Sequence, residues 1–150
     1  AWVPLYWTVG VASEVVFLHY AESLFGGRRR RNVLILCFVL ATVQHLTTAM
    51  ITEVEWLLPV MLLHGFSFGI WFYTSVTWLG DAVDERDRAR AQGLYHTLGF
   101  GFGGVLSSLG AGFLYTLGEG ELLFGVAACL NLVTAVLAFF WIKRPNDGVS

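Results

Sequence analysis

The sequence predicts an all-α integral membrane protein, a polytopic bundle of five transmembrane helices, and three observations support this. First, 56% of the 150 residues are hydrophobic and only 13% are charged, and the mean hydropathy of +0.65 is unlike that of a soluble domain. Second, the apolar residues fall into five segments, each close to the roughly 20 residues that a helix needs to cross a bilayer. Third, most of the charged residues gather in the short connections between these segments.

The five apolar segments comprise residues 2–25, 33–51, 56–79, 94–117 and 122–142. Because the connections between them are short, consecutive helices are expected to be antiparallel neighbours. The chain begins with Ala rather than Met, so we expect it to be a piece of a longer protein.

The basic residues predict the orientation of this bundle. All nine lie in the connections 26–32 and 80–93 or in the tail that begins with Lys143 and Arg144, whereas the other two connections contain only glutamates as charged groups. Cytoplasmic loops of membrane proteins carry an excess of Lys and Arg. We therefore expect a multi-pass protein of the cell (inner) membrane, with the first residues of this chain outside and the last in the cytoplasm. The net charge of −2 gives no reason to expect a nucleic-acid partner, and the lipid bilayer is the expected one.

The first segment carries Glu14 near its middle. A carboxylate at that depth is costly, so it is expected to be protonated, paired or in contact with water. Acidic groups inside a membrane usually mark ion or substrate pathways, and the alternative here is a structural hydrogen bond to a neighbouring helix. Trp7 lies seven residues before Glu14 and therefore on the same face of the helix.

Polar residues on the next two segments lie at a depth similar to that of Glu14. Gln44 and His64 are each about 12 Å from the outer helix ends, and Glu14 is about 6 Å deeper. Ser67 and Trp71 follow His64 at i+3 and i+7, which gives the third helix a polar and aromatic stripe that a lipid-facing helix would not need. We expect these groups to line one cavity.

Small residues are spaced for close helix packing. Gly99, Gly103, Ser107 and Ala111 follow each other at i+4 in the fourth segment, and the Gly65–Gly69 pair repeats the spacing in the third. Such ridges let two helix backbones approach each other closely.

No pattern indicates an enzyme or a cofactor. Cys37 and Cys129 lie in apolar runs without the spacing of a metal or redox site, and the sequence contains neither a nucleophile elbow nor an HExxH motif. We therefore expect no catalytic activity, no metal and no cofactor.

Several stretches resemble the major facilitator superfamily, and within it the branch of the 3-phenylpropionate permease and the lactose permease. They are GVASEVVF (10–17), the basic turn after LFGG, EWLLPVMLLHGFSFG (55–69), RARAQGLY (88–95) and GAGFLYTLG (110–118). The resemblance covers essentially the whole chain and aligns it with the last five of the family's twelve helices. It implies part of the C-terminal half of a major facilitator fold, with the N-terminal remainder of the transporter as a partner.

The resemblance also implies roles for particular residues. Glu14 matches the acidic position of this branch and His64 matches the histidine of the tenth helix, so both are expected to take part in proton coupling. Two positions depart from the family pattern. Gln44 stands where the branch typically has an arginine, and Ser67 stands where the lactose permease has a glutamate. The loss of the arginine removes the obvious partner of an anionic substrate.

The sequence therefore predicts secondary active transport, as proton-coupled symport of a small organic solute that is aromatic, sugar-like or nucleoside-like. Glu14 and His64 are the expected proton-coupling residues, and the expected substrate contacts are Gln44, Ser67, Trp7 and Trp71. The alternative is a non-transporting or uncoupled membrane receptor or scaffold with the same fold, which the missing arginine and the missing second acid favour.

Overall fold

The computed structural model describes residues 3–142, and these form helices and turns without any strand. Trp2, Lys143 and Arg144, which entered the predictions above, lie outside the described residues. The helices are α1 (Val3–Phe25), α2 (Arg30–Met50), α3 (Leu57–Ala82), α4 (Arg88–His96) and α5 (Gly103–Trp141). The short elements between them are the 3-10 turns η1 (Val54–Trp56) and η2 (Glu85–Asp87) and the π-helical η3 (Thr97–Phe102).

The helices extend further than the apolar segments do. α1 ends at Phe25, where its apolar segment ends, but α2 begins at Arg30 and α4 at Arg88, several residues before the apolar runs that they lead into. Apolar composition marks the part of a helix that avoids water, whereas backbone hydrogen bonding continues into a charged stretch. The connection predicted over residues 80–93 is therefore mostly helical.

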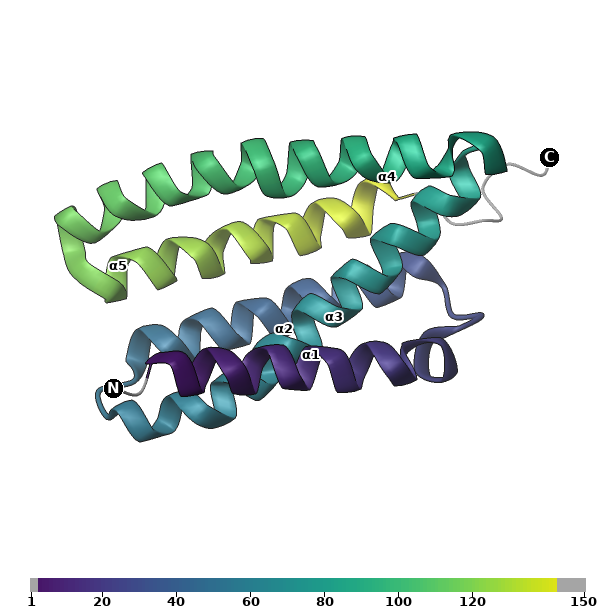
Figure 1. Cartoon of the computed structure of the whole chain (residues 1–150). Coiled ribbons are helices and arrows are strands. Elements are labelled where there is room, and N and C mark those ends of the chain that lie inside the picture. The colour runs from purple at the N-terminus through teal and green to yellow at the C-terminus, as the bar shows by residue number, and fades with distance from the viewer. Residues whose placement is uncertain (1–2, 143–150) are drawn as a thin grey trace.

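α5 contains a sharp break. Gly118 (φ −160°, ψ 27°) and Glu119 (φ 53°, ψ −150°) leave the helical conformation, and the two halves of α5 run in opposite directions (Figure 1). The break falls in the predicted connection 118–121. α4, η3 and the first half of α5 form one long rod before it.

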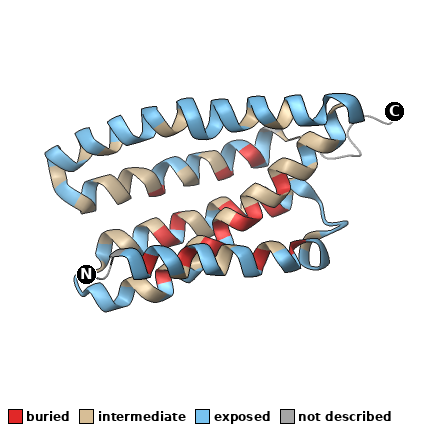
Figure 2. Ribbon diagram, viewed as in Figure 1, coloured by how far each residue is buried: buried red, intermediate tan, exposed pale blue. Residues whose placement is uncertain are grey.

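The core lies where α1, α2 and α3 meet. α3 packs against both α1 and α2, and α2 also packs against α5. Buried residues gather on these contacts, while the first half of α5 is exposed over most of its length (Figure 2). The central cluster consists of Phe17, Ala21, Val33, Leu34, Cys37 and Ile70.

The two ridges of small residues behave differently. The close approach predicted for Gly65 is confirmed, because a methyl group added there would lie 2.7 Å from the Glu14 backbone nitrogen and 2.8 Å from the Gly10 carbonyl oxygen. On the longer ridge, a methyl group at Gly99 would meet nothing within 4 Å, and one at Gly103 would meet only the Leu98 carbonyl oxygen of the same rod, at 3.3 Å. In the described part of the chain, that ridge is an open face.

Three stretches of the described chain are long and apolar enough to cross a membrane. They are Arg30–Met50, Val54–Ala82 and Glu85–Phe140, and the last contains the break in α5. α1 is not among them, although it has 23 residues, and it carries Glu14 and Glu22. The structure thus confirms an all-helical bundle whose helices include stretches long and apolar enough to span a membrane.

Candidate functional site

A cavity of about 230 Å³ lies where α2, α3 and α5 meet. We call it the central cavity. It is lined by Cys37, Phe38, Ala41, Gln44, His45, His64, Ser67, Phe68, Trp71 and Asn131. Four residues predicted from the sequence, Gln44, His64, Ser67 and Trp71, are therefore brought to one place.

Three of these side chains form a continuous hydrogen-bonded chain. The Ser67 hydroxyl donates to Gln44 Oε1 at 3.2 Å and is also 3.1 Å from the His64 carbonyl oxygen. Gln44 Nε2 lies 3.2 Å from His64 Nδ1. Gln44 and Ser67 are each 5% exposed, so these bonds replace those that water would otherwise supply.

This chain determines which nitrogen of His64 carries the proton. The Gln44 amide nitrogen can only donate, so His64 Nδ1 accepts and a neutral His64 holds its proton on Nε2. The ring therefore keeps an N–H that is available to a solute or to a proton acceptor. One wall of the central cavity is thus polar, and its donor and acceptor groups have fixed positions because each member of the hydrogen-bonded chain orients the next.

Sequence reasoning missed two polar residues of the cavity. His45 Nδ1 donates to the Ala41 carbonyl oxygen at 2.6 Å, which leaves its Nε2 as an acceptor when the ring is neutral. Asn131 donates from Nδ2 to the Ala127 carbonyl oxygen at 2.8 Å. His45 directly follows Gln44 and therefore points about 100° away from it around the helix, but both residues line the cavity because α2 faces α3 and α5 at once. Asn131 could have been recognised from the sequence, because it is the only amide side chain in the apolar segment 122–142.

An aromatic wall adjoins the polar one. The Trp71 ring lies 5.5 Å from Phe68, 5.9 Å from Tyr95 and 5.7 Å from Phe100, measured between ring centroids. Tyr95 and Phe100 come from α4 and η3, so the aromatic wall ties α3 to the rod that follows it. Offset and edge-to-face packing at these distances is favourable for aromatic rings.

Trp7 and Glu14 stand apart from the cavity lining. The Trp7 ring centroid is 6.3 Å from that of His64, but Trp7 is 66% exposed. Glu14 is half-buried beside the close α1–α3 contact at Gly65, and within residues 3–142 its carboxylate makes no hydrogen bond. The structure does not join Glu14 to His64 or Gln44.

Among residues 3–142, no carboxylate and no arginine lines the central cavity. Across residues 3–142, no three His, Cys, Asp or Glu side chains are grouped so that they could hold a metal ion. The groups present are amides, a hydroxyl, imidazoles and aromatic faces. This donor set suits hydrogen bonding and stacking with an organic molecule.

The fold and the cavity define a multi-pass helical membrane protein with a polar pocket between its helices. The model of the MFS_1 like family matches residues 2–126. This is most of the chain, which therefore belongs to that family of the major facilitator superfamily, as its motifs predicted.

One relative is similar over 115 residues with 27% identity, the probable 3-phenylpropionic acid transporter of Escherichia coli (strain K12). The match covers 76% of this chain and 30% of the relative, so the chain spans about a third of the length of the curated relative that it matches. No solved structure gives a significant match.

Proposed function

We propose that this chain is part of a secondary active transporter that moves a small organic solute across the cell membrane. The observation that carries the proposal is the Ser67–Gln44–His64 chain, which presents oriented polar groups to a cavity inside an apolar helix bundle. Polar groups are costly in such a bundle and usually mark a substrate or ion path. The transporter relative and the family support the same activity.

The membrane arrangement that we propose has five spans. α1, α2 and α3 cross singly, the rod from α4 to Leu117 crosses as the fourth, and the second half of α5 returns as the fifth. These spans would form part of the C-terminal half of the domain, and the other half of the same protein would complete the substrate path, because transporters of this kind work by rocking two halves around a central site. The arginine-rich turns would face the cytoplasm.

The proposed substrate is uncharged and carries both a ring and hydrogen-bonding groups. Gln44, His64 and Ser67 supply the polar contacts, and Trp71 supplies an aromatic face. Trp7 would extend this surface beside His64. Aromatic, sugar-like and nucleoside-like solutes all have this chemistry. Since no guanidinium or ammonium from the described part of the chain lines the cavity, a carboxylate substrate would need a cation from elsewhere in the protein.

Glu14 and His64 are the proposed proton-coupling residues. Glu14 has no hydrogen-bond partner within the described residues and lies beside Gly65, the residue that follows His64. A carboxylate next to such a close helix contact would gain or lose a proton as movement of the helices changes its exposure to water. We propose that Glu14 takes a proton in one facing state and releases it in the other, and that the Nε2–H group of His64 contacts the substrate.

The test is a comparison of the wild-type protein with Glu14→Gln in proteoliposomes, using the full protein. External pH is followed in weak buffer as aromatic acids, sugars and nucleosides are added in turn. We expect one class to cause alkalinisation in the wild type and none in Glu14→Gln, while exchange of internal for external substrate persists in the variant. Glu53→Gln is the matched control, because it removes an exposed carboxylate from a connection and should leave alkalinisation intact.

The alternative of an uncoupled or non-transporting protein is tested by the same assay. Substrate uptake without any pH change in the wild type would indicate an uncoupled carrier. Substrate binding without uptake, in folded protein, would indicate a receptor or scaffold. Full proton-driven accumulation by Glu14→Gln would remove Glu14 from the mechanism.

A further inference from the structure

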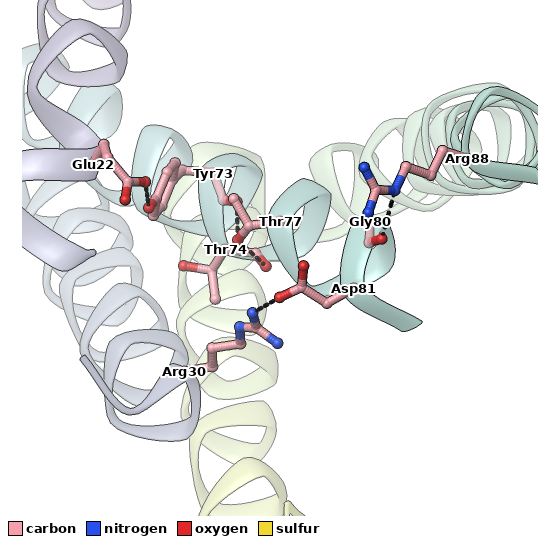
Figure 3. Close-up of polar contacts among 8 residues, drawn as sticks. All are labelled: Glu22, Arg30, Tyr73, Thr74, Thr77, Gly80, Asp81 and Arg88. Carbon is pink, nitrogen blue, oxygen red and sulfur yellow. Dashed lines mark hydrogen bonds and ion pairs between the residues drawn. The ribbon is translucent and has the colours of Figure 1, made fainter. Parts of the chain in front are cut away.

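A second and larger cavity lies away from the central cavity, at the turn between α1 and α2. Its volume is about 930 Å³, and we call it the turn cavity. Its walls are the end of α1, the turn itself, the start of α2, the last turns of α3 and Ile142, which follows α5. Figure 3 shows polar contacts among some of the lining residues, such as Glu22, Arg30 and Asp81. Nothing in the proposed transport mechanism uses it.

The turn cavity has an excess of positive charge. Arg28, Arg29, Arg30 and Arg31 line it, together with the carboxylates of Glu22 and Asp81. Arg30 pairs with Asp81, and Glu22 accepts a hydrogen bond from the Tyr73 hydroxyl. Both carboxylates are thus engaged. Within the described part of the chain, the other three arginines have no carboxylate partner.

Aromatic rings and a helix end orient this charge. The Arg28 guanidinium lies 5.9 Å from the centroid of the Phe25 ring and that of Arg31 lies 5.2 Å from the Phe139 ring, which leaves their N–H edges unused. α2 begins at Arg30, and the residue before it makes no side-chain capping bond. The unpaired N–H groups of a helix N-terminus attract anions.

A buried hydroxyl supplies an independent indication of a ligand. Thr74 lines the turn cavity, is only 2% exposed, and its Oγ1 has no hydrogen-bond partner within the described residues. It lies between the Glu22–Tyr73 pair and the Arg30–Asp81 pair in the view of Figure 3. Thr77, one turn later, donates to the Tyr73 carbonyl oxygen at 2.8 Å. Buried hydroxyls in folded proteins are nearly always satisfied, so the unpaired one points to a missing acceptor.

We propose that the turn cavity binds a phosphate-type anion, either the headgroup of an anionic lipid or a soluble phosphate. Arg28 and Arg29 would contact its oxygens, the N-terminal N–H groups of α2 would add further donors, and the Thr74 hydroxyl, whose Oγ1 is shielded from solvent in the structure, would turn toward the anion and donate one hydrogen bond. Charge-assisted hydrogen bonds of this kind are the strong ones in proteins, and guanidinium groups match the geometry of a phosphate.

The test measures thermal unfolding of the full protein in detergent, with phosphatidylglycerol, phosphatidylcholine or inorganic phosphate added. A ligand that binds only the folded state raises the unfolding midpoint, and titration gives an apparent Kd. We expect phosphatidylglycerol or inorganic phosphate to raise it. Arg28→Gln/Arg29→Gln should weaken this binding about thirtyfold, at roughly fivefold for each arginine.

Thr74→Val separates binding from folding. The substitution keeps the shape of the side chain and removes a hydroxyl that has no partner, so the midpoint without ligand should stay the same or rise. The apparent Kd should nevertheless weaken about tenfold. The matched control is Arg86→Gln/Arg90→Gln, which removes two equally exposed arginines that do not line the turn cavity. Its binding should equal that of the wild type.

The outcomes are distinct. A rise with phosphatidylglycerol but not with phosphate assigns a lipid headgroup, and a rise with phosphate alone assigns a soluble ligand. The proposal is overturned if neither raises the midpoint, if phosphatidylcholine acts as strongly, or if the control loses as much binding as Arg28→Gln/Arg29→Gln. Unchanged binding by Thr74→Val would overturn it as well.

Discussion

At the scale of single residues, Gln44 holds the polar chain of the central cavity together, because one amide accepts from Ser67 and donates to His64. An arginine at this position would be a donor only and could not accept from the Ser67 hydroxyl. The departure from the family pattern at Gln44 and the neutral character of the cavity are therefore linked. The amide replaces a fixed charge with a hydrogen-bond relay.

Ser67→Ala tests the energetic value of this relay. The substitution leaves Gln44 Oε1 buried without a donor, so we expect the free energy of unfolding to fall by about 1–3 kcal/mol. Chemical denaturation in detergent measures the change. Ser107→Ala is the control, since the Ser107 hydroxyl donates to the Gly104 carbonyl oxygen on an exposed face, and its effect should be within about 0.5 kcal/mol. Equal losses in both variants would contradict the argument.

Gly27 is the residue that turns the chain between α1 and α2, with φ +73°. Side chains with a Cβ rarely adopt this conformation, so Gly27→Ala should destabilise the protein by about 1–2 kcal/mol although nothing lies within 4 Å of the added methyl. Gly80→Ala, in equally open space but within α3, should be neutral or stabilising. The same denaturation assay should therefore show a loss of stability in Gly27→Ala and none in Gly80→Ala.

Helical periodicity could predict part of the site and not the rest. It placed His64, Ser67 and Trp71 on one face, and the depth argument brought Gln44 to the same level. It did not predict that His45 lines the same cavity, because that depends on how many neighbours α2 contacts. The separation of Glu14 from the cavity depends on where α1 crosses α3, and no spacing within a single helix contains that information.

At the scale of elements, Gly65 determines how closely α1 and α3 pack. A Cβ there would meet backbone atoms of Gly10 and Glu14, which a side-chain rotation cannot relieve. We expect Gly65→Ala to cost about 1–3 kcal/mol of unfolding free energy by forcing the helices apart. Gly104→Ala, where a methyl group meets nothing within 4 Å, is the control and should not destabilise. A loss in Gly104→Ala of similar size would show that helix glycines matter here for another reason.

At the break in α5, a substitution is expected to increase the free energy of unfolding. Glu119 has φ 53° and ψ −150°, a conformation that is nearly restricted to glycine. Glu119→Gly should therefore raise the free energy of unfolding by about 1 kcal/mol. Glu121→Gly, two residues later in regular helix, should lower it by about the same amount. If both variants lost stability, the conformation of Glu119 would not be strained.

The sequence predicted where the helical segments lie along the chain better than where they end. The apolar runs and the Gly118–Glu121 connection match α1, α2, α3 and the two halves of α5. The early starts of α2 and α4 were not predicted, because arginine is a good helix former and gives no signal in a search for apolar residues.

At the scale of the whole molecule, the surface of the described chain is strongly apolar. Large hydrophobic side chains are exposed on every long helix, including Val15, Leu46, Leu62, Leu109 and Phe140. In a membrane protein such faces contact lipid or other helices, and here they surround the small core between α1, α2 and α3. Two groups of polar residues line the central cavity and the turn cavity.

Thiol labelling tests the proposed orientation of the bundle. Cys37 and Cys129 are first replaced by alanine, and a single cysteine is introduced as Thr52→Cys or as Arg86→Cys, both in exposed connections. Because the arginine-rich connections should be cytoplasmic, a membrane-impermeant reagent should label position 52 in intact cells and position 86 only after lysis. Labelling of both positions in lysed cells is the control. The reverse pattern would invert the topology.

The π-helical turn η3 affects how this chain tolerates changes in its length. An α-helix advances about 100° for each residue, so one deletion normally turns everything beyond it toward a different neighbour. A π-helical turn is a wider turn that holds an additional residue. Loss of one residue from Thr97–Phe102 would tighten it into an ordinary turn, and α5 would keep its orientation relative to α4. The middle of this rod is thus a place where evolution can insert or delete a residue at little structural cost.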